Sequence, residues 1–166
     1  MCQENKFWND LKSGKFASMV QESVKGKKIA NPEEVYNTMK PLFAKQDDVE
    51  SFYCIFLNAK NKVLAIEKMF SGSISSSSVY PREIVKKVLS LKSTCIILIH
   101  NHPSGDPEPS RTDYSITSMI GIALNSIGVS IHDHIVIGDG YYSMASSGKL
   151  KTIQDKISDI TTQNIF

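Results

Sequence analysis

The stretch that decides the fold is residues 96–113, which read Ile-Ile-Leu-Ile-His-Asn-His-Pro-Ser-Gly-Asp-Pro-Glu-Pro-Ser-Arg-Thr-Asp. The stretch begins within a continuous and largely β-branched apolar run from Cys95 to Ile99, which is typical of a buried strand. The prolines and the glycine that follow prevent the strand from continuing and predict a turn-rich loop. Ser110, three residues before Asp113, is a candidate N-cap for the next helix.

This stretch brings together residue types that bind metal ions. His100 and His102 end the expected strand, and because side chains alternate along a strand, both imidazoles point to the same face. The loop is short enough to return Asp113 to them. Two imidazoles and a carboxylate suit zinc, and three protein ligands leave a fourth position for water, as in catalytic sites. A lone His-x-His is more often a pair of exposed loop histidines, but the spaced serine and aspartate favour a metal site.

The spacing resembles that of a known family. His100-x-His102, then seven residues, then Ser110-x-x-Asp113 is similar to the motif of the JAMM (MPN-plus) metalloprotease domain. The longer string over residues 100–113 resembles the RadC-like branch of that family in particular. The resemblance implies that His100, His102 and Asp113 hold a zinc ion.

The resemblance covers roughly residues 31–150, with further matches at residues 81–83 and 133–138. It implies an α/β fold, a cytidine-deaminase-like helix-sheet-helix sandwich with a mixed central sheet. The mixture of expected strands and helices independently indicates an α/β sandwich. We expect an N-terminal extension over residues 1–30 without a recognisable helix-hairpin-helix. The JAB/MPN domain follows over residues 31–150, and then a tail over residues 151–166 that is either helical or frayed.

The resemblance also implies a carboxylate outside the ligand set. Zinc lowers the pKa of a bound water to about 7, and a nearby glutamate takes its proton and passes it to the leaving amine. Glu50, which opens an expected strand over residues 50–57, matches that glutamate. From the residues alone, a surface glutamate at a strand edge is the preferred interpretation. Glu83 competes for the role, but its place in the first turn of a helix already explains it.

Four other side chains are candidates for roles at or near the site. Ser110 caps the helix that carries Asp113, and in the family the matching serine also stabilises the oxyanion of the reaction. The resemblance places Asp133 and His134 at the wall of the active site, where they support the ligands. His132 and His134 also stand one residue apart and suggest a second metal site, but a strand entering the core is the favoured interpretation.

Apolar periodicity and turn residues predict the remaining elements. An expected helix covers residues 31–40 and is interrupted by Pro41, after which residues 42–48 continue as a second turn or short helix. Further expected helices cover residues 81–91 and 112–127. Expected strands cover residues 19–24 at an edge, 63–69, 129–131, 134–137 and 141–144.

Composition limits the classes of protein to which the chain can belong. Its 166 residues, 41% hydrophobic and 22% charged, suit a single globular domain. A formal charge of +2 is too small to indicate nucleic-acid binding. Three cysteines without Cys-x-x-Cys spacing indicate free thiols in a reducing compartment. Without an apolar leader or a membrane-length apolar run, we expect a cytoplasmic protein and no membrane partner.

Two functions remain in competition. The first is a zinc-dependent peptidase or isopeptidase that hydrolyses an amide bond of a peptide or protein with a metal-activated water. The alternative is an accessory protein of the RadC type, labelled as DNA repair, in which the metal is structural or vestigial. Nucleic acid as a partner, the substrate and the oligomeric state stay open. A cytidine deaminase is excluded, because the chain lacks the Pro-Cys-x-x-Cys signature.

Overall fold

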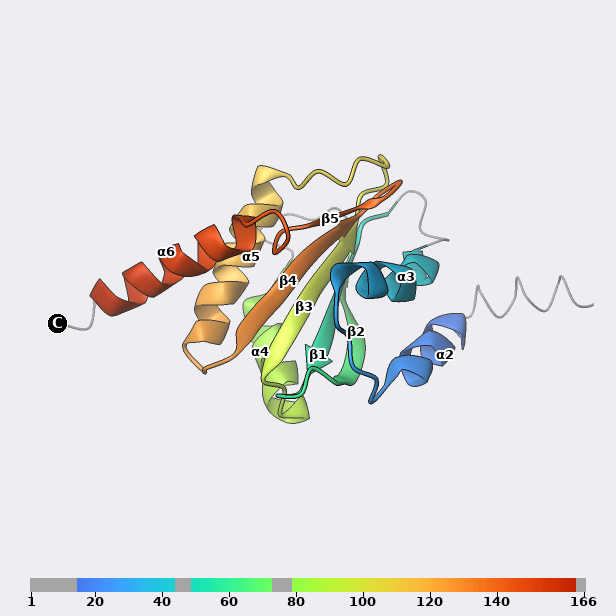
Figure 1. The fold of residues 1–166 in the computed structure, drawn as a ribbon, viewed down its shortest axis with the longest axis horizontal. Coiled ribbons are helices and arrows are strands. Elements are labelled where there is room, and N and C mark those ends of the chain that lie inside the picture. Colours follow the sequence, from blue (N-terminus) through green and yellow to red (C-terminus); the bar gives the residue numbers. More distant parts are fainter. Residues whose placement is uncertain (1–14, 44–48, 73–78, 164–166) are drawn as a thin grey trace, which may run out of the picture.

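The computed structural model describes residues 15–43, 49–72 and 79–163, in which five strands form one sheet between two layers of helices. The strands lie in the spatial order β2-β1-β3-β4-β5 (Figure 1). Their bounds are β1 (Ser51–Leu57), β2 (Val63–Ser71), β3 (Cys95–Asn101), β4 (Ser130–Ile137) and β5 (Tyr141–Ser143). Only β3 and β4 run parallel, so the sheet is mixed, and the predicted α/β sandwich with a mixed central sheet is confirmed.

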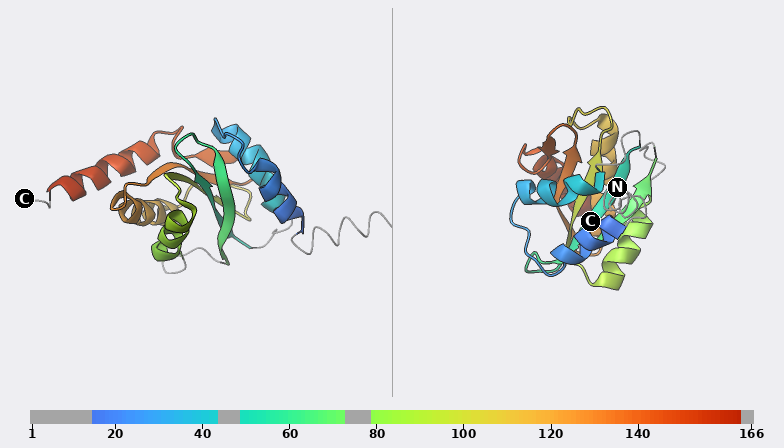
Figure 2. Two further views of the ribbon diagram at one scale, coloured as in Figure 1. Left: turned by 90° about the horizontal axis from the view of Figure 1, so that it is seen from below. Right: turned by 90° about the vertical axis from the view of Figure 1, so that its right-hand side faces the viewer.

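Helices cover both faces of the sheet, as the left view of Figure 2 shows. One layer holds α2 (Lys15–Val24) and α3 (Pro32–Phe43), and the other holds α4 (Pro81–Leu91) and α5 (Arg111–Asn125). The last helix, α6 (Lys149–Gln163), packs against α5. The tail, left open between helix and frayed end, is thus helical as far as Gln163.

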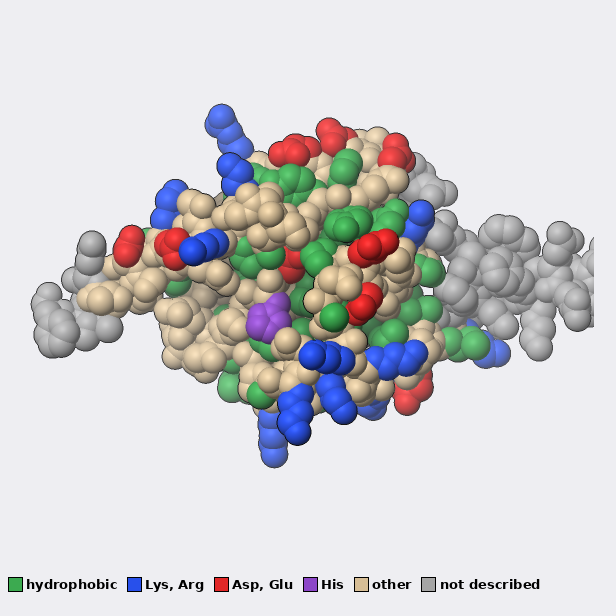
Figure 3. All heavy atoms as spheres, in the orientation of Figure 1, with side chains coloured by type: hydrophobic (Ala, Val, Ile, Leu, Met, Phe, Trp, Pro, Cys, Tyr) green, Lys and Arg blue, Asp and Glu red, His purple; other side chains and the backbone are tan. Residues whose placement is uncertain are grey.

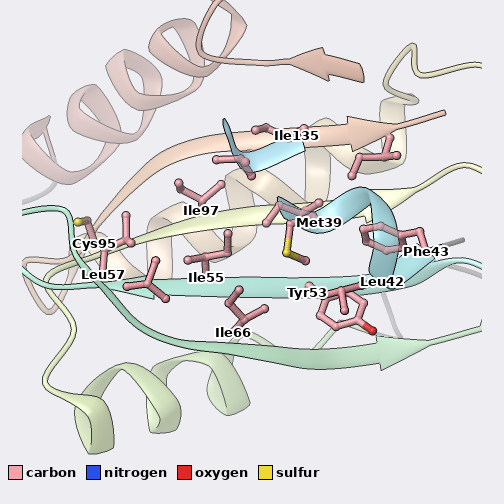
Figure 4. Packing of buried hydrophobic residues seen from close by; sticks show 14 residues of the cluster. Met39, Leu42, Phe43, Tyr53, Ile55, Leu57, Ile66, Cys95, Ile97 and Ile135 are labelled. Atoms are coloured by element: carbon pink, nitrogen blue, oxygen red, sulfur yellow. The ribbon is translucent and has the colours of Figure 1, made fainter. Parts of the chain in front are cut away.

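The two central strands, β1 and β3, are buried along their whole length. Because side chains alternate across a strand, their apolar residues divide between two cores. Figure 4 shows the core beneath α3, which includes Met39, Tyr53, Ile55 and Ile97. The second core lies beneath α4 and α5, and His100 points to that face with its neighbour Leu98. Burial on both faces explains why β1 and β3 are continuous apolar runs.

Two sequence predictions on the first layer are wrong. The edge strand expected over residues 19–24 is instead part of α2, because Val20 and Val24 stand four residues apart and pack on the core from one helix face. Pro41 does not end α3, which continues to Phe43. Burial of Leu42 and Phe43 offsets the hydrogen bond that Pro41 removes.

A third correction concerns β4, which was expected as two separate strands over residues 129–131 and 134–137. It is one strand with an extra residue: Ile131 pairs with Ile96, and Asp133 already pairs with Ile97. This bulge at His132 reverses the alternation of side chains beyond it. Consequently His134 points to the same face of the sheet as His100.

Cys54 and Cys95 are buried free thiols, and burial raises the pKa of both. Among the described helices, none has the length and apolar character needed to cross a bilayer. The remaining predicted elements, including α4 at residues 81–91, agree with the structure to within two residues at most ends.

Candidate metal centre

Two side chains at the end of β3 and one at the start of α5 meet at one edge of the sheet. His100 is the sixth residue of β3, His102 follows the strand directly, and Asp113 lies in the first turn of α5. The loop that joins β3 to α5 crosses the sheet edge and brings the three together (Figure 1). His100 and Asp113 are buried, whereas the side chain of His102 is 14% exposed. One side of the site therefore opens to solvent.

The distances between the donor atoms suit a metal ion. The Nε2 atoms of His100 and His102 lie 3.0 Å apart. The carboxylate of Asp113 lies 3.1 Å from the first and 3.4 Å from the second. Ligand atoms that surround a tetrahedral zinc at 2.0–2.1 Å lie about 3.3 Å from one another. His100, His102 and Asp113 can therefore hold a metal ion, and no other such group occurs among the residues that the structure describes.

Electrostatic interactions within the site keep the Asp113 carboxylate ionised. Burial raises the pKa of Asp113, but hydrogen bonds from His100 and His102 outweigh it and hold that pKa well below its usual range. The pKa of His102 is raised, chiefly by its hydrogen bond to Asp113 and against the effect of burial. A carboxylate that stays ionised beside two imidazoles is the electrostatic setting that a divalent cation requires.

The loop after β3 fixes the ring of His102. Nδ1 of His102 lies 2.8 Å from the backbone oxygen of Asp106, which can only accept, so Nδ1 carries the hydrogen and Nε2 offers its lone pair to a metal. The loop is held in turn by the β4–β5 turn, where the Asp139 N–H donates to the Gly105 oxygen at 2.7 Å. Gly138 allows this approach, because a Cβ there would collide with the Gly105 carbonyl.

Ser110 and Asp113 form the capping box that the sequence predicts. The Ser110 hydroxyl accepts from the Asp113 N–H at 3.2 Å, and the Asp113 carboxylate accepts from the Ser110 N–H at 2.7 Å. The same hydroxyl donates to the Asp113 carboxylate at 2.7 Å. In this structure Ser110 thus positions the Asp113 carboxylate toward the two imidazoles.

Glu50 lies directly before β1 and is half-buried. The negative charge of Glu50 makes the smallest of the contributions that raise the pKa of His102, after its hydrogen bonds to Asp113 and to the Asp106 backbone. The side chain of Asn101 holds the backbone on both sides of Glu50. It accepts from the Ser51 N–H at 2.7 Å and donates to the Val49 oxygen at 3.2 Å.

The structure separates Asp133 from His134. The Asp133 carboxylate accepts from Ser143 Oγ at 2.6 Å and from the Ala145 N–H at 2.9 Å, and it faces away from the three candidate ligands. It therefore secures the segment that joins β5 to α6. Nε2 of His134, by contrast, lies 2.9 Å from Nδ1 of His100, and burial lowers the pKa of His134.

Two residues around the site were missed by the sequence interpretation. Asn101 stands between the two histidines and acts on the segment of Glu50, which is fifty residues away in the chain. Thr117, one helical turn after Asp113, contacts Nδ1 of His134 at 2.6 Å. The i, i+4 spacing from Asp113 was a usable signal for Thr117. His132, the other member of the second histidine pair, is exposed and lies 3.0 Å from Asn61 instead.

Glu83 makes its ion pairs with other residues of α4 and not with the candidate ligands. It forms ion pairs with Arg82 and Lys86 on the exposed face of α4, at 3.3 Å each. These partners account for the residue without any role at the site.

Comparison with known proteins identifies the family. A model of the RadC-like JAB domain matches residues 29–149. A protein of Methanosarcina mazei described as a UPF0758 protein is 41% identical over 126 residues, which cover 75% of this chain and 55% of that protein. A UPF0758 protein of Thiobacillus denitrificans is 38% identical over 134 residues, which cover 80% and 59%. The chain spans little more than half the length of these relatives, and it belongs to the RadC-like JAB domain family.

Proposed function

We propose that this protein is a zinc-dependent peptidase or isopeptidase. The observation that carries the proposal is the convergence of three metal-ligating atoms, from His100, His102 and Asp113, at 3.0–3.4 Å from one another. Two neutral imidazoles and one carboxylate are a donor set that zinc prefers. JAB domains include hydrolases, and the partial exposure of His102 leaves an approach for a substrate.

In this proposal His100, His102 and Asp113 hold the ion. When bound, zinc supplies Lewis-acid catalysis and an acidified water. Glu50 would accept the proton that the attacking water loses as its oxygen bonds to the carbonyl carbon of the scissile amide. It then gives the proton to the amide nitrogen, so that the C–N bond breaks and a neutral amine leaves. Asn101 keeps the Glu50 backbone in place through this exchange.

Ser110 has one hydroxyl hydrogen for two proposed tasks. The structure gives that hydrogen to the Asp113 carboxylate. To stabilise an oxyanion, Ser110 must turn its hydrogen toward the substrate. Its backbone N–H still holds Asp113 at 2.7 Å during that rotation, so the ligand stays oriented.

The test compares Glu50→Gln with Glu83→Gln, each loaded with zinc. Cleavage is measured on libraries of peptides and of isopeptide-linked substrates. Glu50→Gln should lower the rate by about 10²- to 10⁴-fold at unchanged zinc content. Glu83→Gln, a change on the surface of α4, should leave it unaltered. Equal cleavage by wild type and Glu50→Gln, or no cleavage of either library by the zinc-loaded wild type, would contradict the proposal.

One observation favours the nucleic-acid alternative as a second candidate. Backbone pairing between Lys28 and Lys62 joins the loop after α2 to the β1–β2 turn. It gathers exposed lysines on the side of the molecule where Figure 3 shows many Lys and Arg side chains. They are Lys25, Lys27, Lys28, Lys60 and Lys62. Within the described part of the chain, none of them forms an ion pair. Salt-sensitive retardation of DNA, lost when these lysines become glutamine, would support this candidate.

A further inference from the structure

A chain of three buried hydrogen bonds runs from α5 to His100. Thr117 Oγ1 lies 2.6 Å from the backbone oxygen of Asp113 and 2.6 Å from Nδ1 of His134. Nε2 of His134 lies 2.9 Å from Nδ1 of His100. The side chains of Thr117, His134 and His100 are fully buried. The chain thus begins on the backbone of one candidate ligand and ends on the ring of another.

The number of hydrogens available sets the direction of these bonds. The Asp113 oxygen has no hydrogen, so Thr117 donates its single hydrogen there. The contact between Thr117 and His134 then requires that Nδ1 of His134 be the donor. A neutral His134 with its hydrogen on Nδ1 has a lone pair on Nε2, which accepts from Nδ1–H of His100. With a hydrogen fixed on Nδ1, His100 can offer the lone pair of Nε2 to a metal ion.

That lone pair points toward the proposed metal position, since Nε2 of His100 is the atom that lies 3.0 Å from His102 Nε2 and 3.1 Å from Asp113. If these hydrogen bonds ran in the opposite direction, Nε2 of His100 would no longer be free to bind a metal ion. If Thr117 donated to His134, then His134 would donate to His100 through Nε2, and the hydrogen of His100 would occupy its own Nε2. A protonated Nε2 is no ligand, so the direction of the chain decides whether the site is ready for a metal.

The surroundings hold both rings in this arrangement. Phe52 stacks on His100, with the ring centroids 6.1 Å apart, and it meets His134 edge-on at 5.6 Å. Phe52 is itself fully buried and lies opposite His100 on β1. Packed between an aromatic ring and α5, the two imidazoles have little room to rotate away from each other.

We propose that Thr117 is a positioning residue of the metal site, which acts through His134 to fix the His100 tautomer that presents Nε2. A threonine hydroxyl that bonds the carbonyl four residues earlier is common in helices. Here the second contact of that hydroxyl, to His134, gives it a further task. The proposal rests on the proposed metal site but not on the reaction performed there.

The test measures the tautomers in the metal-free protein and the zinc affinity separately. Long-range ¹H–¹⁵N correlation spectra at about pH 8 assign the hydrogens on each imidazole. Zinc affinity follows from competition with a chelator. The variants are Thr117→Val, which removes the hydroxyl at similar volume, and Thr117→Ser, which restores it. The control is Ser118→Ala, which removes a bond to the carbonyl of Tyr114 on the same helix and leaves the chain intact.

Wild type should carry a hydrogen on Nδ1 of both His100 and His134, and none on Nε2 of His134. Thr117→Val should move the His134 hydrogen to Nε2 and weaken zinc binding by about 10- to 100-fold. Thr117→Ser and Ser118→Ala should match wild type. A hydrogen on Nε2 of His134 in wild type, or a Thr117→Val protein that binds zinc as tightly as Ser118→Ala, would overturn the proposal. If wild type took up no zinc, the proposed metal site and the proposed function would fail together. The position of the His134 hydrogen in wild type and in Thr117→Val would then show separately whether Thr117 sets that tautomer.

Discussion

Replacing Gly138 by alanine should damage the metal site from outside the ligand set. A Cβ at Gly138 would collide with the Gly105 carbonyl and approach the nitrogen of Pro107. These are backbone atoms, which cannot swing aside as a side chain can, so the loop after β3 must retreat. The loop carries the Asp106 oxygen that holds His102, and thus the ring of His102 loses its orientation.

The expected loss in the free energy of unfolding follows from the hydrogen bonds that Gly138→Ala would break. The Asp139–Gly105 bond of 2.7 Å and the His102–Asp106 bond of 2.8 Å each contribute about 1 kcal/mol. Overpacking adds about 1–3 kcal/mol, so the free energy of unfolding should fall by about 3–5 kcal/mol. Loss of the partner of His102 should weaken zinc binding by about 10- to 100-fold.

The matched control is Gly140→Ala, two residues away, where an added Cβ meets open space. Thermal unfolding of the metal-free variants gives stability, and chelator competition gives zinc affinity. Gly138→Ala should unfold at least about 6 °C below Gly140→Ala. If the two variants had the same midpoint and the same zinc affinity, the account of how the loop holds His102 would be refuted.

Two further predictions concern Asn101 and pH. Asn101→Ala should lower the rate of amide hydrolysis about tenfold or more, because it releases the backbone around Glu50. The zinc content, measured by mass spectrometry, should stay unchanged, because the Asn101 side chain contacts no candidate ligand. A lowered zinc content would contradict this prediction. Zinc affinity should fall about tenfold per pH unit below the raised pKa of His102, since the ion must displace that proton. The stability of the metal-free protein changes with pH in the opposite direction to the zinc affinity. The His102–Asp113 interaction stabilises it fully below the unfolded pKa of about 6.5 and is lost as pH rises through the folded value. Calorimetric titrations across about pH 5 to 8 check both directions.

Local signals predicted the parts of the fold where several of them agree. In α4, Pro81 starts a helix whose apolar stripe is regular, and the structure gives the same bounds. In α2 the signal was weak, because Val20 and Val24 are the two side chains packed on the core among those that the structure describes in this helix. Pro41 indicated a helix end, yet burial of the residues after it outweighed that local preference.

The candidate ligands were predictable because their geometry is local. Strand alternation relates His100 to His102, and a capping box fixes Asp113 at the helix start. The supporting residues depend on tertiary structure. The bulge at His132 decides that His134, and not Asp133, faces His100, and sequence alternation alone cannot reveal such an insertion. Asn101 and Thr117 have meaning only once β1 and β4 lie beside β3 and α5.

The most direct measurement of the central claim is the metal content of the purified protein and of His102→Ala, prepared without chelator and determined by mass spectrometry. The account predicts about one zinc per chain in wild type and loss of that zinc in the variant. No zinc in wild type after reconstitution, or full zinc content in His102→Ala and Asp113→Ala alike, would contradict it.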